Sequence, residues 1–82
     1  MRLDKYLKVS RLIKRRTLAN EACDRGLVAV NGKVQRASYE VKVGDRLTLT
    51  FGAHTVTLEV LRVEEHIGAK DADMLYREIE RT

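Results

Sequence analysis

The chain has 82 residues, enough for one hydrophobic core, and its hydrophobic content of 44% is typical of a globular domain. No apolar run approaches the ~18 residues of a membrane span, so the sequence predicts no membrane association through a helix. Cys23 is the only cysteine, which excludes an internal disulfide and fits a reducing cytosol. We therefore expect a cytoplasmic protein.

The charge of the chain is divided unevenly between its two parts. The net charge is +4, but residues 1–36 carry ten Lys and Arg against three acids, a balance of +7. Residues 37–82 carry six against nine, a balance of −3. Such polarity predicts a basic face and an acidic back, and the basic face points to nucleic acid or an anionic membrane as a partner. The alternative reading is a solvated surface that keeps the protein soluble.

The first predicted element is a helix over residues 2–9. Leu3 and Leu7 fall on one arc at helical spacing, with basic side chains on the opposite arc. Asp4 and Lys8 are spaced i, i+4, which predicts a surface ion pair within this helix.

A basic connection over residues 10–16 leads to a second predicted helix, residues 18–25. Thr17 has the side chain of an N-cap, and Gly26 is suited to terminate the helix in the left-handed conformation. The apolar arc of this helix is expected to face the core and consists of Leu18, Ala19, Ala22 and Cys23.

A small antiparallel sheet is predicted next. The strand ending at Val30 runs into Asn31-Gly32, the strongest two-residue hairpin signal. Residues 47–51 and 54–60 alternate apolar with polar side chains around a tight turn at Gly52-Ala53, as half-buried strands do.

The last predicted element is a closing helix over residues 71–81, whose apolar residues recur at helical spacing. The predicted fold class is therefore α+β: two N-terminal helices packed on a small, mostly antiparallel twisted sheet, with a short C-terminal helix. We expect a domain over residues 1–63 and a helical C-terminal extension over residues 64–82, packed on or beside it.

Chemical motifs for catalysis or for metal and cofactor binding are absent from the sequence. Cys23, His54 and His66 lack the paired spacing of a zinc site, and no glycine-rich phosphate loop is present. Cys23 is expected to be a packed core residue, and Tyr39 is the one weak candidate for base stacking. We expect no enzyme, no metal and no cofactor.

Three adjacent basic residues, Lys14, Arg15 and Arg16, stand directly before the second predicted helix. They repel one another and oppose the helix dipole, and a bound polyanion would offset that cost. The exposed basic side chains of the first predicted helix, and those beyond the hairpin tip, extend the same surface. Its chemistry suits the wide minor groove of RNA helices, where shape, 2′-hydroxyls and phosphates are recognised.

The sequence resembles the S-four RNA-binding domain family. The resemblance is carried by RLDKYL at 2–7, TLANEACDRGLVAVNG at 17–32 and VKVGDRL at 41–47. Within the family it closely resembles stand-alone factors of bacterial ribosome quality control, and it is also similar to a small heat-shock relative that binds free large subunits.

This resemblance implies binding to a stalled large ribosomal subunit, through its ribosomal RNA and peptidyl-tRNA, and partnership with an RqcH/NEMF-type protein during C-terminal alanine tailing. It also implies functional roles for Arg2, Asp4 and Arg16. A carboxylate at position 4 can hold a neighbouring arginine or lysine in one rotamer, or it can accept a hydrogen bond from a 2′-hydroxyl or a base amine. We favour the orienting role for this acid within a basic face.

Charge pattern and resemblance together give the candidate RNA-binding residues. They are Arg2, Asp4, Lys5, Lys8, Arg11, Lys14, Arg15, Arg16, Asn20, Lys33, Gln35 and Arg36. We expect a ribosome-associated monomer with no membrane contact. The alternatives are an RNA-binding accessory that acts in trans for an RNA-modifying or aminoacylating enzyme, and a protein-interaction module that uses the acidic back.

Overall fold

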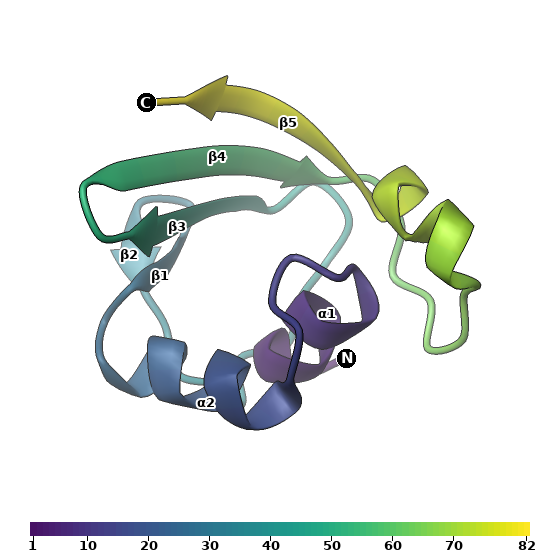
Figure 1. The fold of residues 1–82 in the computed structure, drawn as a ribbon, viewed down its shortest axis with the longest axis horizontal. Coiled ribbons are helices and arrows are strands. Elements are labelled where there is room, and N and C mark those ends of the chain that lie inside the picture. The colour runs from purple at the N-terminus through teal and green to yellow at the C-terminus, as the bar shows by residue number, and fades with distance from the viewer.

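A computed structural model describes residues 1–82 as two helices that cover one side of a five-stranded antiparallel sheet (Figure 1). The elements are α1 (Leu3–Val9), α2 (Arg16–Asp24), β1 (Val28–Val30), β2 (Lys33–Val34), β3 (Arg46–Phe51), β4 (His54–Val60), the 3-10 helix η1 (Ala69–Leu75) and β5 (Tyr76–Arg81). The strand order is β2-β1-β3-β4-β5. The predicted α+β class, with two N-terminal helices on an antiparallel sheet, is confirmed.

The core lies between the two helices, β1 and the inward faces of β3 and β4. Leu3, Tyr6 and Leu7 of α1 are fully buried against alternate residues of the strands, such as Leu47 and Leu58. This alternation is the one predicted from the sequence, because successive side chains of a strand point to opposite faces of its sheet. Cys23 is also buried, as predicted.

Two predicted chain reversals are confirmed by backbone geometry. Asn31 and Gly32 both have positive φ, 52° and 83°, as a type I′ hairpin between β1 and β2 requires. Gly26 ends α2 at φ 74°, with hydrogen bonds from its N–H to the Cys23 carbonyl and from the Leu27 N–H to the Ala22 carbonyl. This pair of bonds is a Schellman motif, which fixes the direction from α2 into β1.

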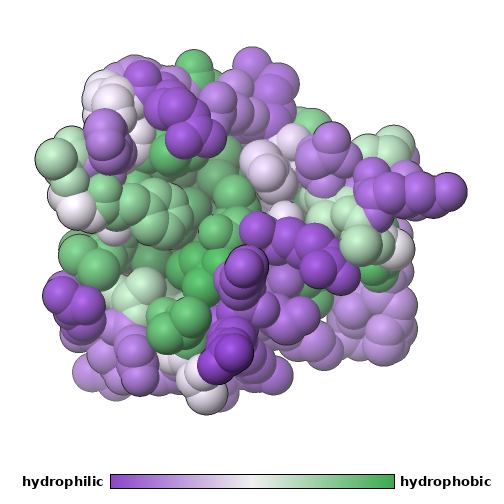
Figure 2. Space-filling view, viewed as in Figure 1, coloured by the Kyte–Doolittle hydropathy of each residue, from purple (hydrophilic) through white to green (hydrophobic).

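The start of α2 differs from the prediction. The helix begins at Arg16 with Arg15 as its N-cap, and no side chain caps it, so the prediction of Thr17 as N-cap is wrong. Leu18 was expected in the core but is 47% exposed, because the buried arc of α2 runs through the small Ala19 and Cys23. Figure 2 shows apolar side chains on the viewed face between the sheet and α2, framed by hydrophilic ones.

The predicted short C-terminal helix is present as the 3-10 helix η1, but its extent over residues 71–81 is wrong, because residues 76–81 form a strand. Ala72 and Leu75 are buried at the i, i+3 spacing of the 3-10 helix η1, but Tyr76 turns to extended backbone and begins β5. β5 pairs with β4, whose edge would otherwise be open, with one register shift between Thr57 and Leu58. Ladder hydrogen bonds outweigh the helical propensity of a segment too short to be stable alone.

The C-terminal segment is attached to the helical layer by one buried contact. The Tyr6 hydroxyl of α1 donates a 2.8 Å hydrogen bond to the Leu75 carbonyl, where η1 passes into β5. The division of the chain at residue 63 stays a prediction. Neither α1 nor α2 is long and apolar enough to cross a membrane.

Candidate nucleic-acid interface

A buried carboxylate joins the two helices. The Asp4 side chain is only 3% exposed and accepts hydrogen bonds from Arg2 Nε at 3.1 Å, Arg2 Nη2 at 3.3 Å and Asn20 Nδ2 at 3.3 Å. Arg16 Nε lies 3.5 Å from Asp4 Oδ2, and the backbone N–H of Lys5 donates to Oδ1 at 2.8 Å. We call Asp4, Arg2, Arg16 and Asn20 the Asp4 cluster.

The local fold explains why these four side chains meet. Asp4 lies in the first turn of α1, where the Leu3 N–H donates to the Tyr39 carbonyl and the Asp4 N–H to the Ala37 carbonyl. The first turn is thereby fixed against residues 37–39. Arg16 and Asn20 are one helical turn apart on α2, so both reach the same carboxylate.

The arginines of the Asp4 cluster are anchored at one end and open at the other. The Arg2 and Arg16 side chains are 49% and 48% exposed, although each contacts a nearly buried partner. An anchored guanidinium loses less rotamer freedom on binding and keeps further N–H donors for an anion. The predicted contact between Asp4 and a neighbouring arginine or lysine is confirmed, with Arg2 and Arg16 as the partners. The predicted Asp4–Lys8 ion pair is wrong because Asp4 faces α2.

The ionisation of Asp4 follows from its partners. Burial raises the pKa of the carboxyl, but hydrogen bonds from Arg2 and Asn20 and the charge of Arg16 outweigh burial, so the pKa of Asp4 lies below its usual value. Asp4 is thus a carboxylate at neutral pH, and its negative charge is balanced by two arginines.

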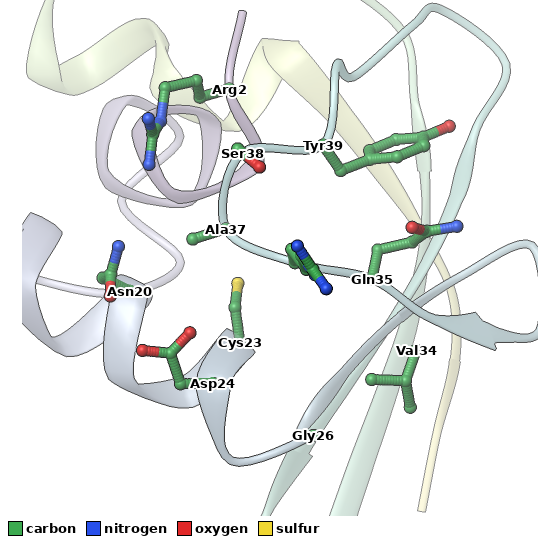
Figure 3. Close-up of a pocket in the computed structure, with 11 residues that line it drawn as sticks. Arg2, Asn20, Cys23, Asp24, Gly26, Val34, Gln35, Ala37, Ser38 and Tyr39 are labelled. Atoms are coloured by element: carbon green, nitrogen blue, oxygen red, sulfur yellow. The ribbon is translucent and has the colours of Figure 1, made fainter.

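A groove of about 790 Å³ extends from the Asp4 cluster to the hairpin. In Figure 3, Asn20 and Asp24 of α2 border one side, Gln35 lies across from them, and Arg2 lies at one end. Arg36 also lines the groove. Four of the sequence candidates line this groove: Arg2, Asn20, Gln35 and Arg36. Asp4 and Arg16 lie beside it, joined to Arg2 and Asn20 in the Asp4 cluster.

The other candidates lie outside this groove. Lys5 is paired with Glu65, with 3.0 Å between Nζ and Oε1. Lys8 and Arg11 line a separate depression beside residues 65–68. Lys14, Arg15 and Lys33 are exposed, the first two before α2 and the third at the hairpin.

On the hairpin side of the groove, sequence reasoning missed Ser38 and named Tyr39 only as a candidate for base stacking. Both residues line the groove, and the Tyr39 hydroxyl donates a 3.0 Å hydrogen bond to Asp45 Oδ2. Burial and this carboxylate raise the pKa of Tyr39. No local pattern marks residues 37–39, whose role comes from backbone contact with α1. No three His, Cys, Asp or Glu side chains of the structure are grouped as a metal site would need.

Comparison with known proteins is informative for the same region. The S4 domain model matches residues 1–47, which contain both helices, the hairpin and the whole Asp4 cluster. The chain belongs to the S4 domain family. This finding confirms the family resemblance that the sequence motifs indicated.

The relatives extend the match to nearly the full chain. The RQC P-site tRNA stabilizing factor of Halalkalibacterium halodurans is 54% identical over 93% of this chain and 86% of its own length. The factor of the same name from Bacillus subtilis is 50% identical over 93% of this chain and 88% of its own. Among solved structures, Vibrio cholerae Heat Shock Protein 15, described as trimeric, matches with a TM-score of 0.89 and 35% identity over 96% of this chain and 81% of its own.

Proposed function

We propose that this chain is a non-catalytic RNA-binding factor of ribosome-associated quality control, which binds a stalled large ribosomal subunit with its peptidyl-tRNA. The observation that carries the proposal is the pair of half-exposed arginines anchored on the buried Asp4 carboxylate. Membership of the S4 domain family and the name of the two bacterial relatives support it.

The Asp4 cluster can recognise an RNA backbone without a catalytic group. Arg2 and Arg16 present N–H donors in fixed directions, which suits phosphate oxygens and 2′-hydroxyls across a shallow minor groove. The Asn20 side chain and the neighbouring groove add polar contacts beside them. Contacts of this kind fix the position of a protein on RNA rather than read its sequence.

The proposal also names the binding partners of the chain and its location in the cell. The chain acts in the cytoplasm on the ribosome, as a monomer, and supports C-terminal alanine tailing together with an RqcH-type protein. The large-subunit ribosomal RNA and the peptidyl-tRNA are its direct ligands. The basic N-terminal part, with a net charge of +7 over residues 1–36, supports RNA as the primary partner.

Sedimentation with separated ribosomal subunits, followed by RNA crosslinking, tests the proposal. We expect tagged protein to travel with large subunits, and Arg2→Gln and Arg16→Gln each to weaken this association. Lys42→Gln, an equal loss of charge at an exposed lysine outside the groove, is the matched control. Equal loss of association in all three variants would mean that net charge alone accounts for the interaction. Co-purification with an RNA-modifying enzyme instead of ribosomes would favour an accessory function.

Salt dependence measures the phosphate contribution separately. If about five phosphates are contacted, the logarithm of affinity should fall linearly with the logarithm of salt concentration, with a slope of roughly −4 to −5. Affinity that does not change between low and physiological salt would contradict binding through the basic face.

A further inference from the structure

The turn that follows α1 contains a backbone conformation that its residue disfavours. Arg11 comes directly after the C-cap Ser10 and has φ 61°, in the left-handed region. Glycine is the usual residue at this position, because a Cβ atom is crowded there. The other non-glycine residue with positive φ is Asn31, a type that tolerates this region well. A strained arginine where glycine would fit better points to a role for its side chain.

The Arg11 side chain borders a depression on the far end of α1. Lys8 and Arg11 line this depression of about 450 Å³ together with Glu65 and His66 of the loop between β4 and η1. It shares no lining residue with the groove at the Asp4 cluster. Two cationic side chains at the end of α1 and an imidazole from the loop thus line one concave surface.

The charges around this depression are not balanced within the protein. The carboxylate of Glu65 is paired with Lys5, which ties the loop to α1. No carboxylate lies within ion-pair distance of Lys8 or Arg11, and both residues are exposed. Their two positive charges remain available to an external anion, with the His66 imidazole as a further hydrogen-bond partner.

We propose that this depression, formed by Lys8, Arg11 and His66, is a second phosphate-binding site for an RNA backbone, separate from the Asp4 cluster. The inference rests on the proposed function and adds a second contact surface to it. Arg11 is the key residue of the site, because the left-handed turn places it beside the depression. A glycine in its place would remove the positive charge and relax the backbone. With both sites, the protein contacts two backbone segments, one near each end of α1.

Arg11→Gly tests the proposal because stability and binding should change differently. We expect the melting temperature to stay the same or rise, since the left-handed conformation suits glycine. Affinity for a short RNA duplex and for large subunits should fall about 3- to 10-fold, and the salt slope should lose about one unit, as for one phosphate contact. Lys8→Gln should weaken binding similarly, and Lys42→Gln, which removes an equal charge elsewhere, should not.

Combination with Arg16→Gln shows whether the two sites are independent. In the Arg11→Gly/Arg16→Gln protein, the logarithms of the two affinity losses should add, as expected for groups that share no partner. Arg11→Gly and Lys8→Gln proteins that bind both probes like the wild type would overturn the second site, even if Arg16→Gln binds poorly. If the wild type binds the duplex but not large subunits, the proposed function fails and the duplex data alone decide the second site.

Discussion

Two aspartates are buried in this small domain, and their surroundings differ in kind. Asp4 lies between the helices and contacts two arginines and an asparagine. Asp45, 8% exposed beside the turn of the β1–β2 hairpin, accepts from Asn31 Nδ2 at 3.1 Å, the Tyr39 hydroxyl at 3.0 Å and the Lys42 N–H at 2.9 Å.

Asp4 is a carboxylate that orients charged side chains, whereas Asp45 is one that holds loop segments together. All three donors to Asp45 are neutral and belong to loops, so its hydrogen bonds hold the hairpin and the chain before β3 together. The arginines on Asp4 keep about half of their side-chain surface in solvent. Asp45 therefore contributes to folding alone, whereas Asp4 also prepares a cationic surface for a ligand.

The largest effect that distinguishes the two is expected from Asp45→Ala. The substitution leaves several partly buried donors without their acceptor, which should lower the free energy of unfolding by about 2–3 kcal/mol. Affinity of the folded protein for RNA should be unchanged. Denaturant unfolding and RNA titration measure the two quantities, with Glu80→Ala on exposed β5 as the control. A loss of affinity as large as that of an Arg16 variant would break the distinction.

A smaller loss of stability is expected from Asp4→Ala, about 1–2 kcal/mol, because the half-exposed Arg2 and Arg16 can be solvated again when their partner is removed. RNA binding should fall as well, in contrast to Asp45→Ala. Unfolding curves compared at one ionic strength test the order of the two effects. A greater destabilisation from Asp4→Ala would show that the cluster is mainly structural.

The pH dependence of stability should depend on Asp4. Since the pKa of Asp4 is lower in the folded protein than the ordinary value of 3.8, the unfolded chain binds more protons between the two pKa values. The stabilisation is complete above the unfolded pKa and is lost as the pH falls through the folded pKa. The difference in unfolding free energy between wild type and Asp4→Asn should therefore shrink on acidification below about pH 4.

Other carboxylates do not confound that difference. The pKa values of Glu40 and Glu65 are also lowered, by hydrogen bonds from the N-terminal amino group and Lys5 respectively. Both groups are present in wild type and variant, so their contributions cancel. A difference that stays constant down to strongly acidic pH would contradict the ionised state of Asp4.

The smallest effect is expected from Tyr39→Phe. The hydroxyl makes one hydrogen bond to Asp45, whose loss should cost about 0.5–1.5 kcal/mol of stability. The aromatic ring remains in the groove, so a purely structural hydroxyl leaves RNA affinity within about twofold, well under the effect of a lost phosphate contact. Affinity that falls beyond that limit would extend the RNA surface along the groove to Tyr39.

Local patterns were sufficient to predict most of the framework. The spacing of Leu3 and Leu7 predicted α1, and Asn31-Gly32 predicted the hairpin, because each signal is complete within a few residues. β5 was mistaken for a helix because its pairing with β4 is a long-range interaction that local spacing does not report. Leu18 was misplaced for a related reason, since the side of α2 that meets α1 is selected by its small residues.

The candidate site was predictable in composition but not in arrangement. Charge and family resemblance selected Arg2, Asp4 and Arg16, yet i, i+4 spacing favoured Lys8 as the partner of Asp4. Burial of Asp4 depends on α2 and on the backbone of residues 37–39, which follow much later in the chain. The sequence also gave no sign that Arg11 adopts a left-handed conformation.

The most direct test of the role of Asp4 is the affinity of Asp4→Asn for purified large ribosomal subunits, measured by sedimentation beside the wild type. The substitution makes the basic face more positive by one charge, so simple electrostatic attraction would tighten binding. We expect binding to weaken instead, because Arg2 and Arg16 lose the charged anchor that orients them. Unchanged or tighter association would contradict the orienting role of Asp4.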